Sequence, residues 1–240
     1  MNTPPPSRPA NTAVLLSGGL DSAVLLADEA TRGPVQPVYV SVGLAWEAAE
    51  RAAVTALLRA WSDRPELLPL ASLSIDMRDV FAATHWAVVG RPPAYDTPDE
   101  DVYLPGRNIV LLGKAAVYCA AAGLGRIVLG TLGHNPFPDA TPAFRSAMAS
   151  ALSLGLAHPL AVEAPYADVA KSEVIRRGAA LNVPMELTLS CMNPVLTRNG
   201  GRPALHCGAC SKCRERHDAF VEAGVTDPTA YVDQRFVGRR

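Results

Sequence analysis

The sequence lacks both a large net charge and any uninterrupted apolar run long enough to span a membrane. Its 240 residues carry 22 Lys and Arg against 23 Asp and Glu, which gives a net charge of −1. Proteins that wrap nucleic acid through bulk electrostatics carry a strong positive excess, so we expect no direct nucleic-acid binding. Gly, Pro, His or charged residues interrupt every apolar stretch, and we therefore expect no transmembrane helix.

The first residues lack the apolar core and the small-residue cleavage site of a signal peptide. Residues 1–11 are instead rich in proline, a composition typical of disordered segments. We therefore predict a disordered lead-in over 1–11 and a cytoplasmic protein.

Cysteine is scarce and unevenly placed. Of five cysteines, Cys119 stands alone in an apolar helical segment and is interpreted as a small buried side chain. The other four, Cys191, Cys207, Cys210 and Cys213, lie near the C-terminus, and the last three are spaced by two residues. Two intervening residues let successive sulfurs face one centre, as tetrahedral zinc requires, and four thiolates typically form a closed structural site. We favour zinc; an iron–sulfur cluster, which also uses this spacing, and unligated thiols are the alternatives.

The sequence also lacks a Walker loop, because no Gly-Lys-Ser/Thr follows its glycine-rich turn. That turn, Ser17-Gly18-Gly19-Leu20-Asp21-Ser22, comes directly after the apolar residues 13–16 and opens a helical segment. Adjacent glycines let the backbone approach a ligand closely, and the amides at a helix N-terminus favour an anion such as phosphate. The turn therefore predicts a phosphate-binding loop; a plain turn of small residues is the alternative.

Apolar strands and helical segments alternate along the chain. The predicted strands cover 13–16, 35–42, 67–75, 126–130 and 158–163. One predicted helix follows the glycine-rich turn, and the others cover 45–61, 108–122, 142–155 and 168–181. Residues 76–100 are predicted to form a long loop near the site. This order predicts an α/β fold with a doubly wound, mostly parallel five-stranded sheet, whose ligands gather at the carboxyl ends of the strands. We predict a nucleotide-binding domain over 12–186 and a small helical zinc-binding appendage over 187–240.

The turn resembles the pyrophosphate loop of the ATP pyrophosphatases, which have an adenine-nucleotide α-hydrolase-like fold. Together with the cysteine cluster and four further segments, it makes the chain similar to the 7-cyano-7-deazaguanine synthase family over residues 13–228. The segments are Tyr103-Leu104-Pro105-Gly106-Arg107-Asn108, Phe137-Pro138-Asp139 with Pro142-Ala143-Phe144, Lys171-Ser172-Glu173-Val174-Ile175 and Ser190-Cys191, followed by Arg216, Phe220 and Asp227-Pro228.

The resemblance implies an ATP-dependent carbon–nitrogen ligase. Family members adenylate the carboxylate of 7-carboxy-7-deazaguanine, convert it with ammonia to an amide, and use a second ATP to form the nitrile, a queuosine precursor. ATP, Mg²⁺ and Zn²⁺ are the implied cofactors, and a homodimer is the implied assembly. The implied catalytic residues are Asp21, Arg107 and Lys171. The implied nucleotide-binding residues are Ser17, Gly18, Gly19, Leu20, Asp21, Ser22, Gly106 and Asn108. The implied zinc ligands are Cys191, Cys207, Cys210 and Cys213.

The substrate side departs from the family pattern. Where the family has Tyr-Gly-Gln-Arg-His, this chain has Val42-Gly43-Leu44-Ala45-Trp46, and Ala140-Thr141 replaces a cysteine and an arginine. Gly43, His134 and Asp139 are the candidate substrate residues. The departures keep two alternatives open. One is a paralogue that adenylates a deazaguanine-type acid and either stops at an amide or transfers the acid to another amine, including an amine of a protein in bacterial defence. The other is a tRNA thiolation enzyme, against which the near-neutral charge argues.

Overall fold

The computed structural model describes residues 11–133, 135–197 and 204–235. Within them, five strands form one sheet in the order β3-β2-β1-β4-β5, and every pairing in that sheet is parallel. The strands are β1 (Thr12–Leu15), β2 (Val35–Ser41), β3 (Ala71–Ser74), β4 (Arg126–Val128) and β5 (Ala161–Glu163). All five predicted strands are therefore present.

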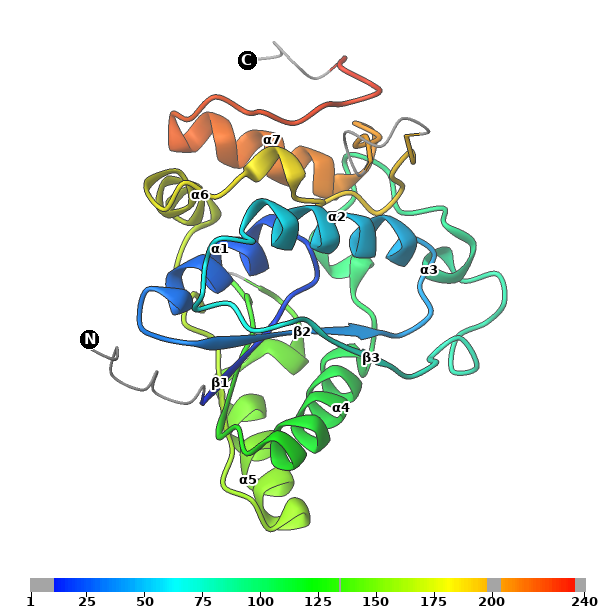
Figure 1. The fold of residues 1–240 in the computed structure, drawn as a ribbon. Helices are drawn as coiled ribbons and strands as arrows, with labels where there is room; N and C mark the ends of the chain where they lie inside the picture. Colours follow the sequence, from blue (N-terminus) through cyan, green and yellow to red (C-terminus); the bar gives the residue numbers. More distant parts are fainter. Residues whose placement is uncertain (1–10, 134, 198–203, 236–240) are drawn as a thin grey trace, which may run out of the picture.

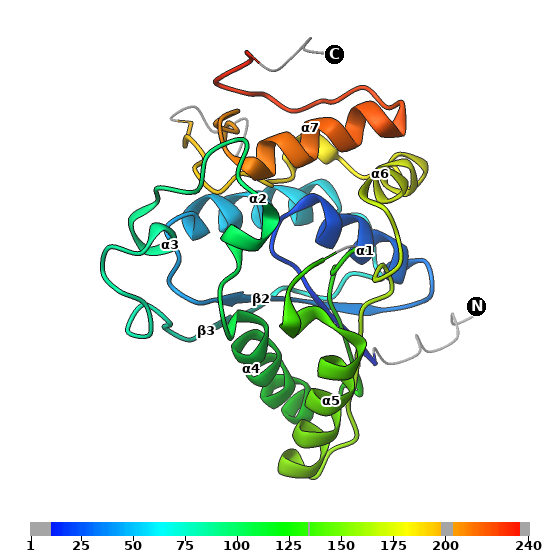
Figure 2. The same ribbon diagram turned by 180° about the vertical axis from the view of Figure 1, so that it is seen from behind.

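Helices cover both faces of this sheet (Figures 1 and 2). They are α1 (Leu20–Ala30), α2 (Glu47–Ala60), α4 (Arg107–Ala122), α5 (Pro142–Leu156), α6 (Lys171–Ala180) and α7 (Ser211–Ala223), with one short turn, α3 (Trp86–Val89). Helices α1, α2 and α6 lie on one face and α4 and α5 on the other, while α7 packs on α6 as an outer layer. The predicted doubly wound α/β fold is confirmed.

Some boundaries differ from the predicted ones. Strand β3 begins at residue 71 and not at 67, and β5 begins at residue 161 and not at 158. Pro69 and Pro159 stand just before these strands, and proline has no amide hydrogen for a strand ladder. The helix predicted over 168–181 begins at Lys171, and the loop predicted over 76–100 contains α3, where His85 Nδ1 accepts the amide of Ala87 at 3.2 Å.

The turn after β1 lies at the topological switch point of the sheet, where the order of the strands reverses direction. Strand β1 is central, with β2 on one side and β4 on the other. In open α/β sheets, ligands bind at the carboxyl ends of the strands where the order reverses. Gly130, just after β4, passes so close to the start of α1 that a Cβ there would lie 3.3 Å from the backbone of Asp21 and Ser22. The turn and the segment after β4 therefore meet at this edge.

Helix α1 is held from both sides. Ala23, Val24, Leu25 and Leu26 are all 0% exposed, because α1 lies between the sheet and α6. Gly178 lets α6 approach closely, since a Cβ on it would lie 2.8 Å from Cγ2 of Val24. A helix that is apolar all round is stable only when it is buried in this way. The position of the turn that precedes α1 is thereby fixed.

Arg216 ties α7 to the segments on either side of it. Its guanidinium group is fully buried and donates to Met185 O at 2.8 Å, to Thr188 Oγ1 at 2.8 Å and to Thr229 Oγ1 at 2.6 Å. Hydrogen bonds to a charged group contribute more than neutral ones, and their loss leaves a buried charge unpaired. The start of α7, which follows Cys210 and contains Cys213, is therefore fixed against the segment that follows α6.

Candidate active site

The turn between β1 and α1 has a backbone shape that needs its glycines. Gly18 has a φ of +79°, and a Cβ on it would lie 3.0 Å from the carbonyl oxygen of Glu50 in α2. Gly19 is the N-cap of α1, and no side chain in the described ranges caps that helix. Ser17 Oγ accepts the amide of Gly19 at 3.3 Å and lies 3.2 Å from Ser22 Oγ. The first amides of α1 therefore suit an anionic ligand.

A cavity of about 580 Å³ adjoins this turn. Of the predicted site residues, those that line it are Ser17, Gly19, Leu20, Asp21, Arg107, Lys171 and Cys191. Gly18, Ser22, Gly106 and Asn108 are neighbours of these residues in the chain but do not contribute to the lining that the structure describes. A cavity of this volume suits a small-molecule ligand.

One end of the cavity carries alternating charges. Lys171 Nζ donates to Asp21 Oδ2 at 3.2 Å and to Glu215 Oε1 at 2.7 Å, and Lys212 Nζ donates to Glu215 Oε2 at 2.7 Å. Burial raises the pKa of Asp21, although Lys171 opposes the shift. Burial by itself would lower the pKa of Lys171, but the carboxylates of Asp21 and Glu215 raise it. Burial would raise the pKa of Glu215, but the two lysines lower it to about 2, so Lys171 and Glu215 are charged at neutral pH.

Lys212 and Glu215 are the residues of this end that the sequence interpretation missed. Both lie near the start of α7, and Lys212 stands between Cys210 and Cys213. Their spacing of three residues puts them on one face of the helix. No local pattern marks that face as part of a site, because only the packing of α7 on α6 brings it to Lys171.

The start of α4 forms another wall. Gly106, with a φ of +79°, is its N-cap. Asp139 Oδ2 accepts the amide of Asn108 at 3.2 Å, and Asn108 Nδ2 donates to Asp139 O at 3.1 Å. Asp139 is buried, and burial raises its pKa. These bonds fix the turn that presents Arg107, whose buried Nε has no hydrogen-bond partner among the described residues. A buried donor without a partner is costly, which favours an anionic ligand beside it.

The three candidate substrate residues lie in different places. Gly43 has a φ of +87°, and a Cβ on it would lie 2.8 Å from Asp76 Oδ1. Backbone conformation and lack of space therefore explain why this position is a glycine. Neither Gly43 nor Asp139 contributes to the described lining of the cavity. His134 lies outside the described residues. Substrate binding by these three residues stays a prediction.

Aromatic and apolar side chains form another part of the cavity lining. Trp46, which precedes α2, and Trp86 in α3 both line the cavity, together with Val102, Leu104 and Phe137. Glu50 lines the cavity too, and its carboxylate accepts from Trp46 Nε1 at 3.0 Å and from Tyr39 Oη at 3.1 Å. The lining of the cavity therefore combines charged groups with aromatic rings.

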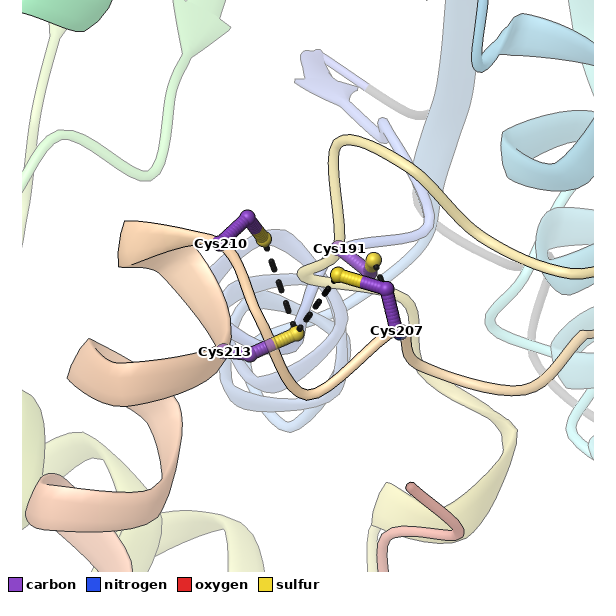
Figure 3. Close-up of side chains that lie close together, drawn as sticks. All are labelled: Cys191, Cys207, Cys210 and Cys213. Carbon is purple, nitrogen blue, oxygen red and sulfur yellow. Dashed lines mark hydrogen bonds between the residues drawn. The ribbon is translucent and has the colours of Figure 1, made fainter. Parts of the chain in front are cut away.

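The four clustered cysteines converge as predicted (Figure 3). Their Sγ atoms all lie within 4.8 Å of one another, and those of Cys207 and Cys210 lie 3.9 and 3.6 Å from that of Cys213. Zinc–sulfur bonds of about 2.3 Å in a tetrahedron place the sulfurs about 3.8 Å apart. The amides of Asn193 and Cys207 donate to Cys191 Sγ at 3.3 and 3.2 Å, as expected around a thiolate. The cluster can hold one metal ion.

The fold and the geometry of this site together define the class of protein. A parallel doubly wound sheet with a Ser-Gly-Gly-Leu-Asp-Ser turn at its switch point is the architecture of the pyrophosphate-loop nucleotide-binding proteins. The model of the family described as "Queuosine biosynthesis protein QueC" matches residues 11–224. The chain belongs to this family of enzymes.

Curated relatives agree over nearly the whole chain. A 7-cyano-7-deazaguanine synthase from Azoarcus sp. (strain BH72) is 34% identical over 226 residues, which cover 91% of this chain and 95% of the relative. A 7-cyano-7-deazaguanine synthase from Methanopyrus kandleri is 35% identical over 240 residues, which cover 93% of this chain and 100% of the relative.

Solved structures show only a distant likeness. A 4-thiouridine synthetase in complex with RNA and bound ATP has a TM-score of 0.45 and 14% identity, over 89% of this chain and 51% of that chain. Across the ranges that the structure describes, every helix is too short or too polar to cross a membrane.

Proposed function

We propose that this enzyme is an AMP-forming carbon–nitrogen ligase that converts 7-carboxy-7-deazaguanine and ammonia, through an amide, into 7-cyano-7-deazaguanine. One observation carries the proposal: in a member of the QueC family, a single cavity joins the turn Ser17–Ser22 to a wall with two tryptophan rings. Such a cavity suits phosphates at one end and a planar heterocycle at the other.

The charged end suits adenylation. A carboxylate is a poor electrophile, and AMP gives it a leaving group. A substrate carboxylate oxygen attacks the α-phosphorus of ATP, and pyrophosphate leaves. Ammonia then attacks the acyl carbon, AMP leaves with the bonding electrons, and one proton is lost to give the amide. A second adenylation, on the amide oxygen, lets AMP and a proton leave as the nitrile forms. Fixed donors aimed at developing phosphate charge lower such barriers. The donors that we propose are the first amides of α1, Arg107 and Lys171, which adjoin the cavity.

Asp21 suits a magnesium ion that accompanies ATP. Its Oδ1 is buried and has no hydrogen-bond partner within the described part of the chain, and Mg²⁺ prefers one or two carboxylates together with phosphate oxygens. Asp21 would hold the ion, which supplies charge neutralisation on the phosphates when bound.

The cysteine cluster suits zinc. Four thiolates within 4.8 Å of one another fit a single tetrahedral ion, whereas a cluster of several irons needs wider spacing. With four protein ligands the ion has no open position, so it would contribute folding free energy and no chemistry. Reduced thiolates are typical of the cytoplasm, which we propose as the location. A homodimer is proposed from the family resemblance alone.

A product assay tests the function. Purified protein is incubated with Mg-ATP, 7-carboxy-7-deazaguanine and ammonium, deazaguanine products are followed by mass spectrometry, and AMP is followed in parallel. We expect the nitrile together with AMP. AMP with only the amide, or with transfer to another amine, would replace the proposal with the paralogue. Absence of AMP formation would contradict it.

A further inference from the structure

Helix α7 reaches the charged end of the cavity directly from the cysteine cluster. It begins at Ser211, and Cys210 and Cys213 flank Lys212 in the chain. Lys212 and Glu215 both line the cavity. The position of Lys212 is therefore determined by the cysteines on either side of it.

The carboxylate of Glu215 lies between two ammonium groups. Its Oε1 is 2.7 Å from Lys171 Nζ, and its Oε2 is 2.7 Å from Lys212 Nζ. The side chain of Lys171 is only 13% exposed and that of Lys212 is 25% exposed. Two like charges held this close in a partly buried site repel each other, and the repulsion is stronger than in water. A carboxylate that accepts from both offsets it, so Glu215 keeps the two lysines together.

The bonds of Lys171 are unequal. Its distance to Asp21 Oδ2 is 3.2 Å, against 2.7 Å to Glu215 Oε1. Phosphate oxygens are good acceptors for an ammonium group, so they can replace the longer bond while Glu215 keeps its own. Glu215 is the one carboxylate that contacts both lysines, whereas Asp21 contacts Lys171.

We infer that Glu215 is a positioning residue, which holds Lys171 and Lys212 at the phosphate end of the cavity, and that Lys212 is a second phosphate-binding cation. The ligand class is a nucleoside triphosphate. The inference rests on the proposed function and adds the helix of the cysteine cluster to the nucleotide site.

Kinetics of AMP formation test the positioning role. Glu215→Gln keeps the size and removes the charge, and we expect it to lower kcat about 10- to 100-fold. Glu215→Asp keeps the charge and should recover part of that loss. The matched control is Asp218→Asn, which removes a negative charge from the same helix at a side chain that is 64% exposed. The control should keep wild-type kcat. Wild-type kcat in Glu215→Gln, or equal losses in Glu215→Gln and Glu215→Asp with loss of metal, would overturn the positioning role.

Nucleotide binding tests Lys212 without the acid substrate. The dissociation constant of magnesium α,β-methylene-ATP is measured by calorimetry on the wild type and Lys212→Met, with metal content checked in both. We expect the constant to rise about tenfold. An unchanged constant with metal retained would overturn the assignment of Lys212. A wild type that binds this nucleotide but makes no AMP from 7-carboxy-7-deazaguanine would overturn the proposed function only, because the calorimetric result stands without it.

Discussion

The indole rings of Trp46 and Trp86 are stacked, with centroids 5.6 Å apart and planes 9° from parallel. They come from different elements, since Trp46 precedes α2 and Trp86 begins α3. Both line the cavity. A stacked pair of this kind offers a flat surface, and stacking of a heterocyclic base on an aromatic side chain is worth about 1–3 kcal/mol.

Trp86→Ala should therefore weaken binding of one planar ligand. We expect the KM for either ATP or the deazaguanine acid to rise about tenfold or more, with little change for the other. Val89→Ala, in the same short helix and 45% exposed in the wild type, is the control and should keep both constants. Steady-state kinetics with each substrate varied in turn decide which ring system stacks there. Unchanged constants for both substrates in Trp86→Ala would exclude this surface from binding.

Asp21→Asn should remove AMP formation while the protein stays folded. The Asp21 carboxylate is on the phosphate turn and contacts Lys171, and the loss of one charged group that acts on the transition state lowers the rate by at least about a hundredfold. Burial raises the pKa of Asp21, so the ionised form is costly to bury and the neutral amide should not lower the melting temperature.

Asp28→Asn is the matched control for Asp21→Asn. It lies in the same helix, α1, and accepts from Tyr166 Oη at 3.1 Å, away from the cavity lining. Normal AMP formation in Asp21→Asn would refute the site, and loss of activity in both variants would point to a disturbed helix.

Gly18→Ala and Gly113→Ala should change stability in opposite directions. Gly18 has a φ of +79° and little space, so alanine there should lower the free energy of unfolding by about 1–2 kcal/mol or more. Gly113 lies within α4, and a Cβ on it would meet nothing within 4 Å. Alanine at 113 should raise the free energy of unfolding by about 0.5–1 kcal/mol. Urea unfolding measures both, and a Gly18→Ala protein as stable as the wild type would contradict the strained turn.

Cys210→Ser should lose both metal and stability. A structural metal contributes its binding free energy to folding, so we expect the free energy of unfolding to fall by at least about 3 kcal/mol. Cys119→Ala is the control, because Cys119 is buried in α4 and is not one of the four clustered cysteines. This variant protein should keep its metal. Elemental analysis and chemical denaturation are the measurements. A stable Cys210→Ser protein would refute the structural role, as would a wild type that contains no metal.

The sequence predicts best those features whose geometry is local. The spacing of Cys207, Cys210 and Cys213 turns their sulfurs toward one centre, and the glycines of the turn Ser17–Ser22 allow its shape, so both features can be recognised in the sequence alone. Cys191 lies farther away in the chain, and it can be added because four thiolates complete a tetrahedron.

The remaining parts of the site depend on contacts between distant segments. Glu215 meets Lys171 across 44 positions of the chain, only because α7 packs on α6. Trp86 lies in the segment 76–100, which is predicted as a loop. Its ring stacks on that of Trp46 only because of the conformation that this segment adopts in the folded protein. Periodicity and spacing describe neighbours along one element, and they carry no information on which elements meet.

Glu50 gives a prediction for the pH dependence of stability. Burial raises its pKa, although the charge of Arg107 opposes the shift. Above the folded pKa, the ionised carboxylate opposes folding by about 1.4 kcal/mol for each unit of the shift. Glu50→Gln removes this charge and keeps both hydrogen bonds, because Tyr39 can rotate its hydroxyl to accept from the amide. We therefore expect the variant to be more stable than the wild type at neutral pH.

The difference should disappear in acid. As the pH falls through the raised pKa, Glu50 becomes neutral in the folded wild type, and below the ordinary value of 4.5 it is neutral in both states. Glu47→Leu is the contrast in the same helix: Glu47 accepts the amide of Val42 at 2.6 Å and Ser41 Oγ at 2.5 Å. Leucine offers no acceptor, so the Val42 amide loses its partner and this variant should be less stable than the wild type. The measurement is the free energy of unfolding by denaturant for each protein, from neutral pH into acid. A Glu50→Gln protein less stable than the wild type at neutral pH would contradict the cost of the buried charge.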